Sequence, residues 1–158
     1  MNYTLDFGAL LGNGYPTLIL GGLVTTLKMT VLAWLLAFAL GSLLAVLRML
    51  NLRALNALIA VYVAFHRNVP MLVHILLWYF GVASIVPPAL NDAINIIGGE
   101  FFYATLAIGL VTAAYVGEDL RSAIRAIPRG QMEASRSLGL SYLQAMRKVI
   151  LPQAFKIS

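Results

Sequence analysis

The chain has 158 residues, of which 61% are hydrophobic and only 11% are charged, against about 45–50% and about 25% in ordinary soluble domains. A small soluble domain could not bury this much apolar surface, so the composition excludes both a freely soluble globular protein and a disordered chain. The net charge is +5, and most of the excess lies in residues 118–158, which hold seven Lys/Arg and three Asp/Glu. Cysteine is absent, which excludes disulfides, thiolate metal sites and cysteine nucleophiles.

The first membrane span is expected over residues 17–47, after an extracytoplasmic leader over residues 1–16. Its second half, Met29–Leu47, has no charged residue and would form about 28 Å of helix, close to the thickness of about 30 Å of a hydrocarbon core. Small residues recur there at every fourth position and would let another helix approach closely, although alanine is also simply common in apolar helices. The predicted packing stripe consists of Ala33, Ala37, Gly41 and Ala45.

The following apolar stretch, residues 52–86, is too long for one straight span and is interrupted by Pro70. Proline removes a backbone donor and biases the residue before it away from helix. The pattern therefore predicts a short amphipathic or partly immersed segment over residues 52–65. A spanning helix is expected over residues 69–86, ended by the proline pair at 87–88.

Three residues at this break, Arg67, Asn68 and Pro70, are candidates for a translocation path. Ionisable groups inside a membrane are costly and are functional by default. The alternative is that Arg67 lies at the cytoplasmic interface and extends its side chain to the headgroups. The length of residues 52–86 permits either depth.

The third span is expected over residues 101–117. Glu118 and Arg121 follow it one helical turn apart, so their side chains can pair where the helix leaves the membrane. The predicted fold class is an all-α integral membrane protein with three transmembrane helices, over about 17–47, 69–86 and 101–117, and a cytoplasmic loop of two short helices.

Lys/Arg asymmetry predicts the orientation, since basic loops stay in the cytoplasm. Residues 48–53 hold two arginines and residues 118–158 hold seven Lys/Arg, whereas residues 1–16 and 87–100 hold none. The N-terminus and residues 87–100 are therefore expected outside, and residues 48–53 and 118–158 in the cytoplasm.

The cytoplasmic segment, residues 118–158, is punctuated by helix start and stop signals. Gln131–Leu138 is expected to form one short helix, with Gly139 supplying a left-handed turn at its end. Residues 141–144 fit an S-x-x-Q capping box that opens a second helix, which Pro152 is expected to end. Two short helices with too little apolar surface to fold alone suggest a docking element.

This segment resembles the EAA loop of ABC-importer permeases, whose pattern is E-A-A-x3-G-x9-I-x-L-P. Two positions differ mildly, since Ser135 replaces the third residue of the pattern and Val149 replaces its isoleucine. The residues that carry the resemblance, and that it assigns to contact with an ATPase, are Gly130, Glu133, Ala134, Ser135, Gly139, Val149, Leu151 and Pro152. A basic juxtamembrane segment held by anionic lipid is the alternative, but it requires none of these spacings.

Upstream segments resemble the polar-amino-acid (histidine/glutamate/aspartate-type) subfamily of these permeases. They are Gly22–Lys28, Arg67–Val73 and Ala123–Gln131, and the Arg-Asn-Val-Pro form is most similar to glutamate/aspartate permeases. The resemblance implies a multi-pass permease subunit of an ATP-driven amino-acid importer in the bacterial inner membrane. The implied partners are a separate cytoplasmic ATPase dimer, a second permease that is identical or homologous, and a periplasmic amino-acid-binding protein.

No enzyme, cofactor, metal or nucleic-acid function is expected. The sequence has no Walker A loop, and His66 and His74 lack the spacing of a metal-binding H-E-x-x-H motif. Family members usually have five spans, so the chain is expected to be a C-terminally truncated permease that ends at Ser158, where a fourth span would begin, and not to transport by itself. The rival hypothesis is a small membrane adaptor, or an inactive fragment, whose basic tail binds a partner without transport.

Overall fold

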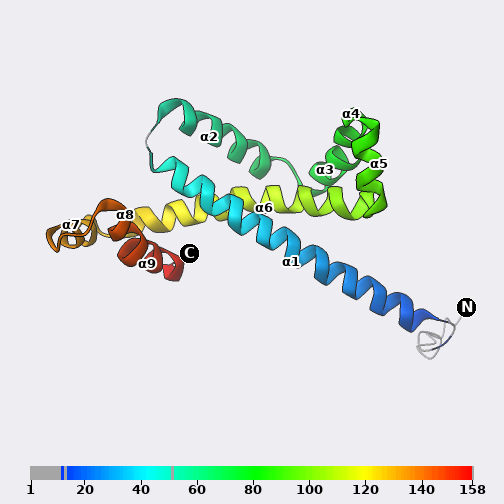
Figure 1. Ribbon diagram of the computed structural model, residues 1–158, viewed down its shortest axis with the longest axis horizontal. Coiled ribbons are helices and arrows are strands. Elements are labelled where there is room, and N and C mark those ends of the chain that lie inside the picture. The colour runs from blue at the N-terminus through cyan, green and yellow to red at the C-terminus, as the bar shows by residue number, and fades with distance from the viewer. Residues whose placement is uncertain (1–11, 13, 51, 158) are drawn as a thin grey trace, which may run out of the picture.

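The computed structural model describes residues 12, 14–50 and 52–157 (Figure 1). Every regular element in these residues is a helix, and α1 (Tyr15–Arg48) and α6 (Gly99–Ala126) are long and apolar enough to cross a membrane. A third crossing is present if the bent pair of helices between them is one span. The predicted all-α integral membrane class is confirmed. The leader predicted over residues 1–16 lies almost entirely outside the described residues.

Helices α1 and α6 pack along each other and run in the same direction (Figure 1). Their contacts advance together along both helices and pair Leu36 with Gly109, Gly41 with Val116, and Leu44 with Gly117. Two parallel helices require the intervening chain to return to the starting side of the membrane. The helices between residues 53 and 96 make that return.

The close approach of α1 and α6 depends on small residues. The buried residues of α1 are Ala33, Ala37, Gly41 and Ala45, the four that recur at every fourth position. A Cβ added at Gly41 would lie 2.8 Å from the Val116 Cβ and 2.9 Å from the Ala113 carbonyl oxygen, so the backbones touch there. Without water to drive apolar association, such close van der Waals packing is what holds lipid-immersed helices together.

The return path consists of α2 (Arg53–Asn68), α3 (Met71–Leu76), the π-helix η2 (Leu77–Val82), α4 (Ala83–Ile85) and α5 (Pro88–Ile96). The helical run over residues 71–85 is bent by 108° from α2. The bend forms because Val69 and Pro70 are extended, with ψ of 132° and 142°. The spanning helix expected over residues 69–86 is therefore a shorter run that joins α2 in one bent pair, and α2 itself extends to Asn68 instead of ending near residue 65.

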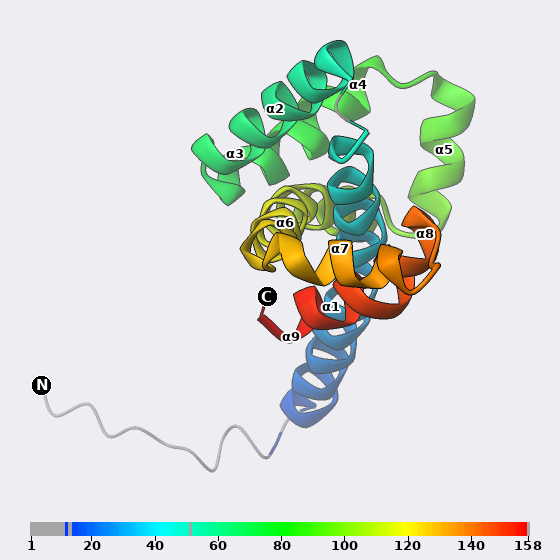
Figure 2. The same cartoon turned by 90° about the vertical axis from the view of Figure 1, so that its left-hand side faces the viewer.

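The last part of the chain folds back on the ends of α1 and α6 (Figure 2). It comprises α7 (Arg129–Ser137), α8 (Tyr142–Ala145), the π-helix η3 (Met146–Ile150) and α9 (Leu151–Ile157). One buried cluster joins it to both long helices, consisting of Ala45, Leu120, Ala123, Ile127, Met146, Ile150 and Ala154. Helix α6 contains the expected third span, residues 101–117, and continues without a break to Ala126.

Pro152 does not end a helix, contrary to the sequence-based expectation. It is the second residue of α9, which continues directly from η3. A proline inside a continuous helix lacks the N–H that would donate to the preceding turn. The wider π turn over Met146–Ile150 immediately before it changes the hydrogen-bond register, so the helix passes the proline and extends to Ile157.

Candidate functional site

Three charged side chains meet where α1 ends beside α6. The Arg48 guanidinium pairs with one carboxylate oxygen of Glu118, and Arg121 donates to the other at 2.9 Å. The Arg48 side chain is only 11% exposed, so this pair is largely removed from solvent. The predicted pairing of Glu118 with Arg121 is confirmed. The pairing with Arg48 carries no sequence signal, because seventy residues separate the two partners.

Residues 129–157, here called the C-terminal segment, begin with α7, which carries the first residues of the resemblance. Gly130, Glu133 and Ala134 are exposed on this helix. Ser135 is buried, and its hydroxyl donates to the Gln131 carbonyl oxygen at 2.6 Å, so it faces the opposite side. Helix α7 therefore presents a carboxylate and two small residues outward while Ser135 is directed into the fold.

The turn after α7 has the geometry that the sequence predicts. Gly139 adopts φ of +84°, a left-handed conformation that strains other L-residues. Its N–H donates to the Arg136 carbonyl at 2.9 Å, and the next N–H, of Leu140, donates to the Ser135 carbonyl at 3.2 Å. Ser141 and Gln144 then form the predicted capping box, with reciprocal side-chain and backbone hydrogen bonds of 2.9 and 3.3 Å.

The remaining residues of the resemblance lie in η3 and α9. Val149 and Leu151 are partly buried and pack against the cluster shared with α1 and α6. Pro152 is exposed. The resemblance thus divides into exposed positions on α7 and anchoring positions on η3 and α9, and the two groups lie on one continuous piece of structure.

Two leucines on the outer side of the C-terminal segment were not singled out by the sequence. Leu138, at the end of α7, is 84% exposed, and Leu143, in α8, is 77% exposed. They flank the Gly139 turn from both sides. Large apolar side chains this exposed beside a tight turn are typical of a contact surface. The only sequence signal for them is that they are apolar residues in an otherwise polar stretch.

The residues at the break between α2 and α3 lie close to α6. The Arg67 guanidinium carbon is 5.1 Å from the centre of the Tyr115 ring, a cation–π contact between the two elements. Asn68 is exposed, and Pro70 precedes the first turn of α3. The three candidate path residues therefore gather at the bend, and the structure connects Arg67 to the third span through Tyr115.

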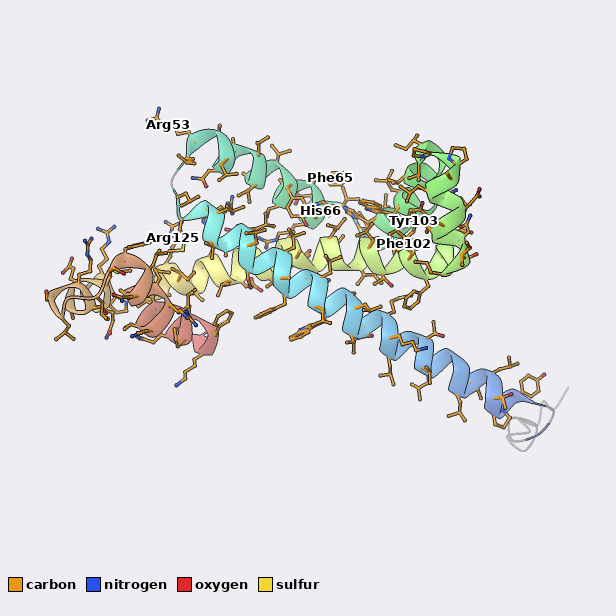
Figure 3. All side chains as sticks on the ribbon, in the orientation of Figure 1. Arg53, Phe65, His66, Phe102, Tyr103 and Arg125 are labelled. Atoms are coloured by element: carbon orange, nitrogen blue, oxygen red, sulfur yellow. The ribbon has the colours of Figure 1, made fainter. Side chains whose placement is uncertain are left out.

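Two buried histidines stabilise the same bend. The rings of His66 and His74 stack with centroids 5.0 Å apart and planes at 24°, and Phe65 contacts His74 edge-on. Phe65 and His66 lie at the end of α2 (Figure 3). Beside them, Tyr62 donates to the Leu110 carbonyl of α6 at 2.6 Å. These ring contacts pack the end of α2 against α3. Among the described residues no group of three or more potential metal ligands occurs.

The chain is similar to known proteins of membrane transport. Residues 37–157 match the family described as binding-protein-dependent transport system inner membrane component. The chain is 36% identical over 146 residues to the glutamate/aspartate import permease protein GltJ of Escherichia coli (strain K12), covering 88% of this chain and 58% of the relative. It is 37% identical over 141 residues to the probable glutamine ABC transporter permease protein GlnM of Bacillus subtilis (strain 168), covering 89% and 61%.

A more distant relative and a solved structure extend this picture. The arginine transport system permease protein ArgU of Corynebacterium glutamicum is 34% identical over 149 residues, covering 90% of this chain and 46% of the relative. A crystal structure of an amino acid ABC transporter with histidines superimposes with a TM-score of 0.78 and 34% identity, covering 98% of this chain and 67% of that one. The chain spans about half to three fifths of the length of these relatives.

These matches define an integral membrane protein of the permease class. The chain belongs to the family of binding-protein-dependent transport system inner membrane components, which covers more than half of its length. The matched range, residues 37–157, includes the junction at Arg48, the bend at Pro70 and the whole C-terminal segment. The relatives are named as permease proteins, which are not themselves enzymes.

Proposed function

We propose that the chain acts as a permease subunit of an ATP-driven importer of polar amino acids, and that its C-terminal segment couples it to a separate cytoplasmic ATPase. The observation that carries the proposal is the combination of an exposed outer surface with a buried inner one. Glu133, Leu138 and Leu143 are exposed, while Met146 and Ile150 share a core cluster with α1 and α6. A force applied to the outer surface would reach the membrane helices through that cluster.

Tight packing makes such transmission physically reasonable. Buried side chains packed at crystal-like density move with their neighbours, because they cannot deform independently. Ala45 of α1 and Leu120 of α6 contact the same cluster as Ile150. A displacement of the C-terminal segment would therefore shift the ends of both long helices together, and the Arg48–Glu118 pair would keep those ends in register.

Glu133 is the proposed polar contact to the ATPase. It is exposed, and among the described residues it takes part in no ion pair. A carboxylate that becomes buried at an interface requires a cation or several N–H donors from the partner. The leucines at 138 and 143 would supply the apolar part of the same contact.

The bend between α2 and α3 is the proposed part of the translocation path. Helix breaks inside a membrane are tolerated where they are buried in protein or line a water-filled cavity. Arg67, Asn68 and Pro70 lie at the break, and a cation there would favour a substrate with an acidic group. Relatives are named for glutamate/aspartate, glutamine and arginine transport, and the Arg-Asn-Val-Pro form favours glutamate or aspartate for this chain.

The remaining partners follow from the family and from exposed apolar surface. The first half of α1 extends beyond α6 (Figure 1), and its large side chains are exposed, among them Leu18, Leu20, Leu23 and Leu27. We assign this surface to lipid and to a second permease subunit, identical or homologous. The chain would lie in the inner membrane with its N-terminus outside and residues 118–158 in the cytoplasm, and a periplasmic amino-acid-binding protein would deliver substrate.

The experiment is co-purification of a candidate ABC ATPase subunit, expressed together with this chain, with wild type and with Glu133→Lys. Charge reversal at the proposed contact should reduce ATPase recovery at least fivefold while leaving membrane insertion unchanged. Asp119→Lys is the matched control, because Asp119 is an exposed carboxylate on α6, outside the C-terminal segment. Equal recovery with both variants would refute the coupling assignment. If the chain were instead a membrane adaptor, the rival function, the ATPase should not co-purify with it. Expressing all subunits together should then not stimulate the uptake of labelled amino acid.

A further inference from the structure

A basic cavity lies between the ends of the long helices and the C-terminal segment. Its volume is about 580 Å³. Its walls come from the end of α1, the last turns of α6, the start of α7 and the start of α8. The lining residues are Arg48, Met49, Arg121, Ile124, Arg125, Arg129 and Tyr142. Figure 3 labels Arg125 on the last turns of α6, where the C-terminal segment folds back.

The cavity has an excess of positive charge. Four arginines line it and no carboxylate does. The nearest counter-charge is Glu118, which pairs with Arg48 and Arg121. Within the part of the chain that the structure describes, Arg125 and Arg129 take part in no ion pair. Even with Glu118 counted, the site carries three uncompensated positive charges, which favours an anion.

The cavity lies at the level where the apolar helices end. Arg48 is the last residue of α1 and follows nineteen uncharged residues. On α6, Glu118 is the first charged residue after Glu100, so the uncharged stretch ends at the same level. In a bilayer this level is the headgroup region. The abundant ligands there are molecules that carry an anionic group on an apolar tail.

An apolar groove adjoins the basic cavity. It has a volume of about 350 Å³ and shares Met49 and Tyr142 with the cavity as a common wall. The rest of its lining is almost entirely apolar and comprises Val46, Leu50, Leu143, Met146, Arg147 and Leu151. A cationic cavity beside an apolar groove at headgroup level matches the anionic head and the apolar tail of one amphiphilic molecule.

We propose that this site binds one anionic phospholipid, with its phosphate in the arginine cavity and an acyl chain along the adjoining groove. Arginine is suited to phosphate because its planar guanidinium donates two hydrogen bonds in fixed geometry. The site would bridge Arg121 and Arg125 of α6 to Arg129 of α7. The lipid would thus fasten the C-terminal segment to the membrane helices, a role separate from substrate transport.

The test is native mass spectrometry of the purified full chain from detergent containing equal amounts of phosphatidylglycerol and phosphatidylcholine. One phosphatidylglycerol should be retained per chain, and phosphatidylcholine should not be. Arg125→Gln with Arg129→Gln should weaken phosphatidylglycerol binding at least tenfold. Arg53→Gln with Arg136→Gln is the charge-matched control, because neither residue lines the cavity or the groove, and it should change binding less than twofold.

A second variant and a competition keep the result unambiguous. Leu143→Gln changes an exposed side chain of the groove and should also weaken binding, by at least threefold, without the risk to folding of a core substitution. Water-soluble glycerophosphoglycerol and millimolar inorganic phosphate should not displace the lipid. Equal retention of phosphatidylcholine, an equal effect of the control pair, or displacement by free phosphate would overturn the proposal, the last by showing a site for free anions.

Discussion

Arg48 and Glu118 form an ion pair that joins the end of α1 to the point where the uncharged stretch of α6 ends. The two residues are seventy positions apart, and the side chain of Arg48 is almost fully removed from solvent. Because α1 and α6 run in the same direction, this pair fixes their register at one level. Arg48 also lines the basic cavity between the long helices and the C-terminal segment.

Removing the carboxylate of this pair should destabilise the protein. Glu118→Gln leaves the Arg48 charge buried without compensation and should cost about 2–3 kcal/mol, less than the 3–5 kcal/mol of a fully buried pair because Glu118 is 27% exposed. Thermal unfolding in detergent measures the loss. Asp119→Asn, one residue further and exposed, is the control and should change the midpoint little. The double variant Arg48→Met with Glu118→Met should recover much of the stability, and no recovery would argue against charge burial as the cause.

The contact between α1 and α6 should be sensitive to one methyl group. Gly41→Ala places a Cβ 2.8 Å from Val116 and 2.9 Å from the Ala113 backbone, so the helices must separate, at a cost of about 1–3 kcal/mol. Gly22→Ala is the matched control, because nothing lies within 4 Å of its added Cβ. Unfolding midpoints of the two variants in the same detergent make the comparison. Equal midpoints would mean that α1 and α6 do not pack as described.

The turn at Gly139 should depend on its left-handed backbone. Gly139→Ala is free of steric contact but must adopt φ of +84°, which costs an L-residue about 1–2 kcal/mol. Hydrogen exchange of α7 and α8 should accelerate roughly fivefold to thirtyfold if that energy is lost locally. Gly130→Ala, within helix α7 and with an equally open Cβ, should slow exchange or leave it unchanged. Faster exchange in both variants would point to a general effect of the methyl group.

The proposed orientation can be read from reporter fusions. A reporter placed after Gly98, in the stretch without Lys/Arg, should be active outside the cytoplasm, and one placed after Gly130 should be active within it. The structure places residue 98 at the start of α6 and residue 130 beyond its end. Exchanged reporter signals would contradict the orientation and with it the proposed ATPase contact.

Local signals in the sequence predicted the elements that depend on neighbouring residues. Apolar length indicated α1 and the body of α6, and the capping box and Gly139 turn have the geometry that their residue types require. Those features are set within one helical turn, so spacing alone is sufficient. The bend of 108° at Pro70 was only partly predictable, because a proline marks where a helix breaks but not the direction in which the next one leaves.

Features set by distant contacts could not be predicted. The Arg48–Glu118 pair depends on the register of two helices, which no local pattern encodes. Pro152 was expected to end a helix, but the π turn before it and the packing of Ile150 and Ala154 against α6 let the helix continue. Leu138 and Leu143 are apolar residues in a polar stretch, and their exposure follows only from the way α7 and α8 fold back.

The most direct test of the coupling proposal is site-specific cross-linking from the C-terminal segment to the ATPase. The chain has no cysteine, so the variant Glu133→Cys carries a single thiol. With the ATPase co-expressed, a benzophenone attached to the thiol of Glu133→Cys through a maleimide should photo-cross-link to it, by insertion into a C–H bond of the partner, in high yield, and the yield should change when ATP is bound. Arg53→Cys, exposed at the start of α2 (Figure 3), is the control and should give little product. Equal yields from the two positions, or none from position 133, would contradict the account.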